Sequence, residues 1–462
     1  MTGVQTCALP ISLTEEISQR DLLFHQVGHG WTCAPLGFPA DGWQELPDEA
    51  IGEQARRALA EVGGRRGFFG NIPLNTNLCT SSKDVRELVT GTIADWCAAH
   101  PAVRFLHFWL ADGFNNTCEC PACIERPSDY YVQMLNELDE KLSARGLPTR
   151  IVFLVYCDLL WPPCSQTLKN PDRFVLMFAP ISRDYNRSYA DMDPAAETCG
   201  IPPYRRNRNE QPKELGTCLA FLRAWQKLGA KDSFLFDYHL MWDHLKDPGY
   251  EDSALLLYRD MNSLDRLDLN GMVSCQLTRC SFPTGLPMRA MAEALWDGTK
   301  PYEDVRRRYY QEAFGSSWET AAGYLSRMTE LLDPRYTRME PPAPYPEAER
   351  LARVREAGAA AAAFGPEAQL LAKTESDSTR RRSWEILALH AKYIVGLASC
   401  TETRILEGPA AAEGKISALT DFLMQNEVTF QSVYDPDQVC ARICEIVSAW
   451  APDKDLSQEG ET

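Results

Sequence analysis

The stretch RFLHFWLADGFNNTCECPAC, residues 104–123, decides the fold that the sequence predicts. It opens with a continuous apolar run, which is typical of a strand buried on both faces of a parallel sheet. The run ends abruptly at Asp112 and Gly113, and a polar loop with three cysteines follows. A (β/α)8 barrel takes its functional groups from the carboxyl ends of its strands. A carboxylate at this point therefore indicates both a barrel and the location of its site.

Five further apolar runs of this kind are separated by helix-like stretches. They are LLFHQVGHG (22–30), RIVFLVYCD (150–158), RFVLMFAPI (173–181), SFLFDYHL (233–240) and NGMVSCQ (270–276). In the helix-like stretch 128–146, Ser128 has the residue type of an N-cap and Gly146 that of a helix stop. This alternation predicts βα units on a parallel sheet. A doubly wound open sheet is the alternative, but no Gly-rich phosphate turn follows any of these runs.

The first twelve residues, MTGVQTCALPIS, do not have the pattern of a signal peptide, because they lack a basic segment and an uninterrupted apolar core. Residues 2–11 read back into codons as a common sequencing-library adapter translated in frame. We therefore treat residues 1–11 as an artefact and expect that a lost N-terminus carried the first two βα units. Residues 1–11 should then pack poorly, and the sheet should have an open edge beside residues 22–30.

Beyond Phe282 the pattern is helical only. The expected fold class is α/β, a (β/α)8 TIM-type barrel that lacks its first strands and is followed by an all-helical region. The expected segments are the artefact (1–11), the truncated catalytic barrel (12–285), helices packed on the barrel (286–333), a Pro-rich linker (334–350), a C-terminal helical domain (351–450) and a disordered tail (451–462).

Charge and composition narrow the classes of partner. The chain has 47 lysine and arginine residues against 64 aspartate and glutamate residues, a net charge of −17, which disfavours nucleic-acid binding. No apolar run reaches the ~18 residues that indicate a membrane span, so we expect no membrane partner. Sixteen cysteines spread over 462 residues favour reduced thiols and a cytoplasmic location, because disulfide frameworks belong mainly to small secreted domains. The sequence does not indicate the oligomeric state.

Side chains suited to sugar chemistry recur at the strand ends. Carboxyl groups protonate the leaving oxygen or stabilise positive charge at the anomeric carbon, while aromatic rings stack on sugars and amides bond their hydroxyls. The candidate catalytic carboxylates are Asp112, Asp158, Asp237 and Glu119. The candidate substrate-binding residues are His29, Trp31, Asn75, Asn77, Trp109, Asn115, Trp161, Arg183, Tyr238, His239, Gln276 and Arg279. Any single aspartate could instead cap a helix, but recurrence on consecutive strand ends favours function.

The cysteines Cys118, Cys120 and Cys123 have the spacing C-x-C-x2-C. Three thiolates on one loop could bind a structural zinc ion, which takes four tetrahedral ligands. The fourth ligand is not visible locally, and the candidates in neighbouring strand-end loops are Cys33, Cys79, Cys157 and Cys164. Three reduced cysteines that pack a surface loop are the alternative.

A family resemblance rests on six stretches of the sequence. They are HGWTC (29–33), TNLC (76–79), FWLADGFNNTCECPAC (108–123), PSDYYVQMLNELDE (127–140), VYCDLLWPP (155–163) and RFVLMFAPISRDY (173–185). Over residues 13–315 the chain resembles bacterial proteins of the domain-of-unknown-function family 4838. That family is similar to barrel glycosidases of families 20, 67 and 163. The resemblance implies a glycoside hydrolase whose carbohydrate substrate contains N-acetylhexosamine or uronic acid.

The family 20 pattern has an adjacent Asp-Glu pair, whereas this chain has Asp112-Gly113. We therefore expect Asp112 to be the acid or orienting carboxylate, with Asp158 or Asp237 as its partner, and Glu119 to act only if its loop folds back over the cleft. Carboxyl groups about 5 Å apart would imply retention of configuration and about 6.5–9.5 Å inversion. No cofactor is required by this chemistry. The alternatives are a noncatalytic carbohydrate-binding protein and a zinc-dependent hydrolase.

Overall fold

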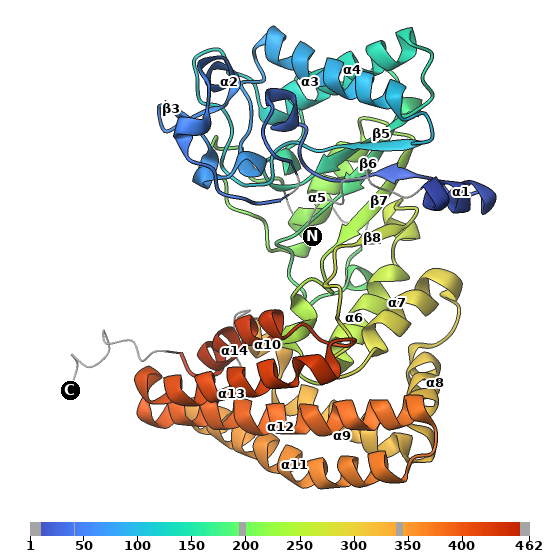
Figure 1. Cartoon of the computed structure of the whole chain (residues 1–462), viewed down its shortest axis with the longest axis vertical. Coiled ribbons are helices and arrows are strands. Elements are labelled where there is room, and N and C mark those ends of the chain that lie inside the picture. The colour runs from blue at the N-terminus through green and yellow to red at the C-terminus, as the bar shows by residue number, and fades with distance from the viewer. Residues whose placement is uncertain (1–10, 41, 194–199, 339–344, 453–462) are drawn as a thin grey trace. The chain divides into compact units, whose positions relative to one another are not determined.

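The computed structural model describes residues 11–40, 42–193, 200–338 and 345–452, with side chains from residue 15 onward. The chain forms two compact units, whose elements Figure 1 labels. The first unit comprises residues 1–183, 194–237 and 265–273, and the second comprises residues 184–193, 238–264 and 274–462. Residues 1–10 of the predicted artefact and 453–462 of the predicted tail lie outside the described residues. The predicted segment boundaries stay predictions.

The first unit is built on a six-stranded parallel sheet whose strands lie in chain order. The strands are β1 (His25–Gln26), β4 (Phe105–Phe108), β5 (Arg150–Val155), β6 (Phe174–Phe178), β7 (Asp232–Asp237) and β8 (Met272–Ser274). A doubly wound sheet reverses its strand order at a switch point, whereas successive strands of a (β/α)8 barrel follow one another. The predicted partial barrel is confirmed. Within the described part of the chain β1 pairs with β4 alone, so the expected open edge is present.

The continuous apolar runs form the strands because both faces of the sheet are covered. Every residue of β6 is buried, and so are Leu106 and Phe108 of β4. The remaining elements of this unit are α1 (Ile11–Gln19), α2 (Glu53–Ala58), a hairpin of β2 (Glu61–Val62) and β3 (Arg65–Arg66), α3 (Lys83–Ala99), α4 (Pro127–Ala144) and α5 (Leu215–Gln226). Figure 1 shows α3 and α4 side by side over the strands.

The ends of α4 test two sequence predictions. The helix begins at Pro127 with Arg126 as its N-cap, so the prediction that Ser128 caps it is wrong. Proline at the first helical position has its φ preset and lacks the N–H that would need a cap, which moves the start of the helix upstream. Gly146, with φ +66°, follows the last turn, and the predicted stop is confirmed.

Tyr131 ties α4 to the strand ends that carry the candidate site. Its fully buried hydroxyl donates to the carbonyl of Phe108, the last residue of β4, and accepts a hydrogen bond of 3.0 Å from the N–H of Leu154 in β5. A buried phenol that satisfies two backbone groups fixes their positions, because leaving them unpaired costs free energy. The ends of β4 and β5 are therefore held by the helix between them.

The second unit is helical. Its helices are α6 (Glu251–Met261), α7 (Leu286–Asp297), α8 (Tyr302–Phe314), α9 (Trp318–Leu331), α10 (Pro334–Thr337), α11 (Glu347–Thr374), α12 (Ser378–Glu407), α13 (Pro409–Phe430) and α14 (Pro436–Trp450). The predicted Pro-rich linker starts with α10, whose Tyr336 packs on Trp450, so this part is folded. Across the described residues, no helix has both the length and the hydropathy to cross a membrane.

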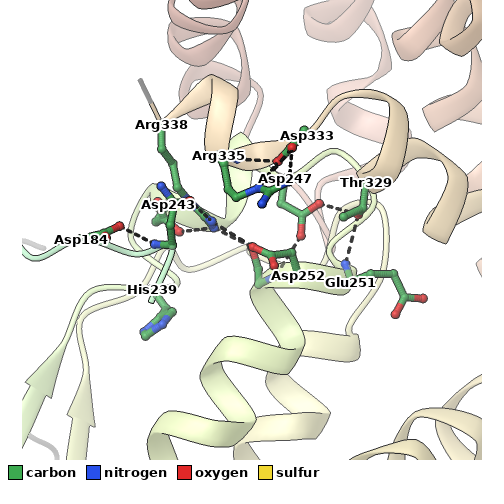
Figure 2. Close-up of polar contacts among 12 residues, drawn as sticks. Asp184, His239, Asp243, Asp247, Glu251, Asp252, Thr329, Asp333, Arg335 and Arg338 are labelled. Atoms are coloured by element: carbon green, nitrogen blue, oxygen red, sulfur yellow. Dashed lines mark hydrogen bonds and ion pairs between the residues drawn. The ribbon is translucent and has the colours of Figure 1, made fainter. Parts of the chain in front are cut away.

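Arg338 is the centre of a buried ion network in the second unit (Figure 2). Its guanidinium donates to both carboxylate oxygens of Asp243 at 3.0 and 2.8 Å, to Asp252 at 2.9 Å and to the side-chain carbonyl of Asn186 at 3.0 Å. The side chains of Arg338 and Asp243 are each 3% exposed. Arg338 and Asp243 thus form a bidentate ion pair. Removing either residue would destabilise the fold, because the charge of the other would stay buried without compensation.

We expect Arg338→Met to lower the free energy of unfolding by about 3–5 kcal/mol, because it leaves the Asp243 carboxylate buried and unpaired. Urea titration followed by circular dichroism measures the change. The matched control is Arg327→Met, since Arg327 forms exposed ion pairs with Glu330 and Glu356 in the same unit. The control should cost less than about 1 kcal/mol. Equal effects of the two substitutions would contradict the network.

The fully buried Asp247 carboxyl group predicts a pH dependence of stability. Burial, with help from the Asp252 carboxylate, raises the pKa of Asp247 to about 6. The native protein then binds this proton more tightly than the unfolded chain, whose aspartates titrate near 3.9. Its stabilisation is complete below about pH 4 and is lost as the pH rises through about 6. The Thr329 hydroxyl donates a hydrogen bond of 2.6 Å to Asp247 Oδ1, which opposes the rise of the pKa but does not cancel it.

We expect the urea midpoint of the Asp247→Asn variant to change less between about pH 4.5 and pH 7.5 than that of the unsubstituted protein. Asp304→Asn, at an exposed position of α8, should leave that change as it is. A variant at position 247 with an unaltered pH profile would show that this carboxyl group does not control it.

Candidate functional site

Three neighbouring strands bring His29, Asp112 and Tyr156 together just beyond their carboxyl ends. The Asp112 Oδ1 atom lies 3.8 Å from His29 Nε2 and accepts a hydrogen bond of 3.2 Å from the Tyr156 hydroxyl. Chain order places β1, β4 and β5 next to each other, which explains the meeting of residues up to 127 positions apart. The Asp112 side chain keeps 24% of its surface exposed, so its carboxylate can be reached from solvent.

Trp43 covers the other side of the Asp112 carboxylate. Its indole N–H donates a hydrogen bond of 3.0 Å to Oδ2, and the residue is 40% exposed. Trp43 was not predicted from the sequence, because it lies in an irregular stretch far from any strand. The feature that could have identified Trp43 is its large aromatic side chain within the polar segment 42–49. Sequence reasoning also missed Tyr156, although it directly follows β5.

The His29 ring is oriented so that a lone pair faces Asp112. Its Nδ1 atom lies 2.7 Å from the Leu110 carbonyl oxygen, which can only accept, so the proton of the neutral ring is on Nδ1. Burial lowers the pKa of His29, while the charge of Asp112 and the Leu110 hydrogen bond act in the opposite direction. The ring also packs edge-on against Trp109, with centroids 4.9 Å apart. Nε2 of the neutral ring can therefore receive a proton from the direction of Asp112.

Asp158 is buried and holds a loop in place. One carboxylate oxygen accepts from the Asn115 N–H at 2.6 Å and the other from the Asn209 side-chain amide at 2.8 Å. Asn115 and Asn209 are themselves joined by hydrogen bonds of 2.9 and 3.1 Å. Burial raises the pKa of Asp158, and these hydrogen bonds oppose the shift. With both oxygens occupied, Asp158 positions the loop after Asp112.

Amide side chains link the segment 72–77 to the same loop. The Asn77 amide donates to Asn116 Oδ1 at 2.8 Å, and the Asn116 amide donates to the Asn75 carbonyl at 2.7 Å. Asn77 Oδ1 accepts from the Ala111 N–H at 3.3 Å. Gly113 lies against this network: a Cβ atom there would come within 2.4 Å of Asn116 Nδ2. The two predicted asparagines thus lie near Asp112, and the network needs glycine at position 113.

Of the three tryptophans predicted to stack on sugar, Trp109 and Trp161 are buried in the first unit and Trp31 is half-buried. Trp109 is 6% exposed and Trp161 is 2% exposed, with the Trp161 indole N–H on the Pro202 carbonyl. Trp31 donates to the His107 carbonyl at 3.0 Å and packs edge-on against Trp96. These rings support the strand ends. The exposed indole beside Asp112 is instead that of Trp43.

Three further predicted residues of the first unit are Asp237, Arg183 and Glu119. Asp237 ends β7 and is buried, and Arg183 is also buried. Glu119 is exposed, but its carboxylate accepts hydrogen bonds of 2.7 Å from the Gly63 N–H and 2.9 Å from the Asn207 amide. These hydrogen bonds, that to Asn207 first, lower the pKa of Glu119. Glu119 thus fastens its loop to the β2–β3 hairpin.

The remaining predicted residues belong to the second unit. His239 Nε2 lies 3.4 Å from an Asp260 carboxylate oxygen, with both side chains almost fully buried. Tyr238 stacks on Trp242 with ring centroids 5.9 Å apart. Arg279 forms ion pairs of 3.2 Å with Glu427 and Asp435, and Gln276 is half-buried. Arg279 thereby fastens its loop to α13 and to the N-terminal end of α14.

The predicted cysteine cluster has a fourth member. Cys79 joins Cys118, Cys120 and Cys123, and the four Sγ atoms all lie within 4.8 Å of one another. All four thiols are buried and none forms a disulfide. Cys79 was one of four cysteines that the sequence left open as the fourth ligand. This is where the first unit could hold a metal ion.

Comparisons with known proteins leave the family open. No family model matches the chain, and no curated protein matches it. Among solved structures, the chain is similar to a mutant of the O-GlcNAc hydrolase from Thermobaculum terrenum, at 12% identity and a TM-score of 0.37 over 80% of this chain and 77% of that one. A likeness this distant carries no argument about activity. Membership of the domain-of-unknown-function family 4838 stays a prediction.

We expect Asp158→Asn to lower the free energy of unfolding by about 1–3 kcal/mol, because the new NH2 group would face one of the two donors that Asp158 now accepts. Urea titration measures this loss. Asp172→Asn, at an exposed position before β6, is the matched control and should change stability by less than about 0.5 kcal/mol. An Asp158 variant as stable as the control would contradict the positioning role.

Proposed function

We propose that this protein is a glycoside hydrolase in which Asp112 is the acid that protonates the leaving oxygen. The observation that carries the proposal is a partly exposed carboxylate at the carboxyl edge of a partial barrel, held between the Tyr156 hydroxyl and the Trp43 indole. General acids of glycosidases are carboxyl groups flanking the glycosidic bond. Barrel enzymes take such groups from their strand ends.

His29 acts as the proton partner of Asp112. With Nδ1 bonded to the Leu110 carbonyl, the lone pair on Nε2 faces the carboxylate across 3.8 Å. That distance is longer than a hydrogen bond, as is common for catalytic contacts before substrate binds. The hydrogen bonds from Tyr156 to Oδ1 and from Trp43 to Oδ2 hold the carboxyl group in place while the proton moves. The pair can therefore give a proton to a leaving oxygen and recover one from water.

The substrate is a carbohydrate in this proposal. The exposed Trp43 ring offers an apolar face beside the reacting carboxylate, which suits the C–H face of a sugar ring. The Asn75 Oδ1 atom is buried and, within the described residues, has no hydrogen-bond partner. Glycans that contain N-acetylhexosamine or uronic acid are the first to test, because of the family resemblance.

The second carboxylate in this proposal is Asp158 or Asp237. Asp158 is 5% exposed and its oxygens accept hydrogen bonds from Asn115 and Asn209, so it is less accessible to substrate than the partly exposed Asp112. Asp237, at the end of β7, stays the other candidate nucleophile or base. The configuration of the product stays open, since it depends on the separation of the two carboxyl groups.

Two other functions compete with this one. A noncatalytic carbohydrate-binding protein would keep Trp43 and the amides and would not need the carboxylate. The burial of Trp109 and Trp161 argues against an extended stacking platform of the kind that such proteins use. A zinc-dependent hydrolase needs an open coordination position, and four thiolates on one ion leave none.

We expect Asp112→Asn to reduce kcat by about 100-fold to 10,000-fold, the usual contribution of a general acid, with little change in KM. A screen of aryl glycosides and N-glycans identifies the substrate, and steady-state kinetics measure the effect. Trp43→Phe is the companion variant, which keeps an aromatic face and loses the N–H donor. It should have a larger effect on the pH dependence of kcat than on the value of KM.

Each result of this experiment has a definite meaning. Unchanged turnover in Asp112→Asn would refute the assignment of the acid. Glycan affinity that survives this substitution, in a protein that turns over none of the screened substrates, would establish the binding protein instead. Turnover that is abolished by a chelator and restored by zinc would establish the metal-dependent hydrolase.

A further inference from the structure

Four cysteines from two separate stretches of chain point to one centre in the first unit. Cys79 follows the isolated bridge between Leu59 and Leu78, and the other three lie on the loop after β4. Each is at most 6% exposed. Ala60 belongs to the same cluster, and Val62 and Tyr130 pack against it. Four buried thiols are poor hydrogen-bond partners for one another, so their convergence calls for another explanation.

The distances between sulfur atoms fit a single tetrahedral ion. Zinc–sulfur bonds are about 2.3 Å long, and a tetrahedron with such bonds has ligand atoms about 3.8 Å apart. Cys79 Sγ lies 3.6 Å from Cys120 Sγ and 3.9 Å from Cys123 Sγ, and no pair in the cluster exceeds 4.8 Å. These separations are far longer than the roughly 2.05 Å of a disulfide.

We propose that Cys79, Cys118, Cys120 and Cys123 bind one structural zinc ion. Soft thiolate ligands in a tetrahedral set select zinc or iron and disfavour magnesium and calcium, which prefer oxygen. The compactness of the set favours a single ion over an iron–sulfur cluster, because a cluster inserts several irons between its thiolates. Four protein ligands fill the coordination sphere, so the ion has no position for a substrate or a reactive water.

The surroundings of the cysteines suit thiolates. The Glu61 N–H donates to Cys118 Sγ at 3.3 Å, and the Arg66 guanidinium lies 3.9 Å from Cys79 Sγ. The Ser81 hydroxyl is 3.1 Å from Cys123 Sγ and can donate to it. Zinc with four thiolates carries a net charge of −2, and donors around the ligands stabilise that charge and orient the sulfurs.

The ion would join the two segments that frame Asp112. Cys79 lies two residues after Asn77, and Cys118 lies two residues after Asn116, whose side chains bond each other at 2.8 Å. An ion bound by both Cys79 and Cys118, next to the Asn77–Asn116 pair, would hold the loop 111–123 against the segment 72–79. This effect on the catalytic loop rests on the proposed function, whereas the metal binding itself does not.

Metal content of the whole protein tests the proposal. Protein purified under reducing conditions should contain roughly one zinc per chain by plasma mass spectrometry. Exchange for cobalt should give the thiolate charge-transfer and d–d absorption of a tetrahedral tetrathiolate centre. Cys118→Ser and Cys120→Ser should each retain less than about a tenth of the metal and unfold at a lower temperature, because zinc binding contributes directly to folding stability. Cys164→Ser, an exposed cysteine outside the cluster, should retain all of it.

A readout without mutation covers the case in which the variants fail to fold. Titration of the unsubstituted protein with an organomercurial should release zinc in step with the loss of about four thiols. Protein that holds no zinc after reconstitution and gel filtration would overturn the proposal, and stoichiometric iron would overturn the choice of metal. Zinc-loaded protein without glycosidase activity would leave the metal site intact and remove only the proposed function.

Discussion

Parallel pairing of β4 with both β1 and β5 is the constraint on which the candidate site depends. Phe105 is in register with His25 on one side and with Arg150 on the other. Because neighbouring strands run the same way, their carboxyl ends open onto one edge of the sheet. The pairing is short, with four residues in β4 and two in β1. Because this pairing is short, side chains outside the strands, above all Tyr131, also hold that edge of the sheet in position.

Part of this arrangement could be predicted from the sequence because its signals are local. A continuous apolar run marks a strand covered on both faces, and a carboxylate directly after such a run marks Asp112. Other parts rest on contacts between distant residues. Trp43 reaches Asp112 across 69 positions, and Cys79 meets Cys120 across 41. No spacing rule encodes such meetings, so the sequence missed Trp43 and left the fourth cysteine open.

Recurrence of polar and aromatic residues at strand ends proved to have several causes. Indoles such as Trp161 are large apolar groups, and burying them stabilises the fold more than exposing them to a sugar would. Carboxylates such as Asp158 satisfy loop amides that would otherwise be buried without partners. Arg279 pairs with the acidic residues of its own unit. Residue type at a strand end thus selects candidates, and solvent exposure separates buried residues that hold the loops, such as Asp158, from the partly exposed Asp112.

The packing around Gly113 has an evolutionary consequence. A side chain at this position would drive Asn116 away from the Asn75 carbonyl and break the amide network that aligns the two segments beside Asp112. An acidic residue at position 113 could therefore not arise here by a single substitution without loss of that alignment. A larger side chain would require compensating changes in both segments together. Position 113 thus limits which sequences can keep the Asp112 carboxyl group steady at the end of its strand.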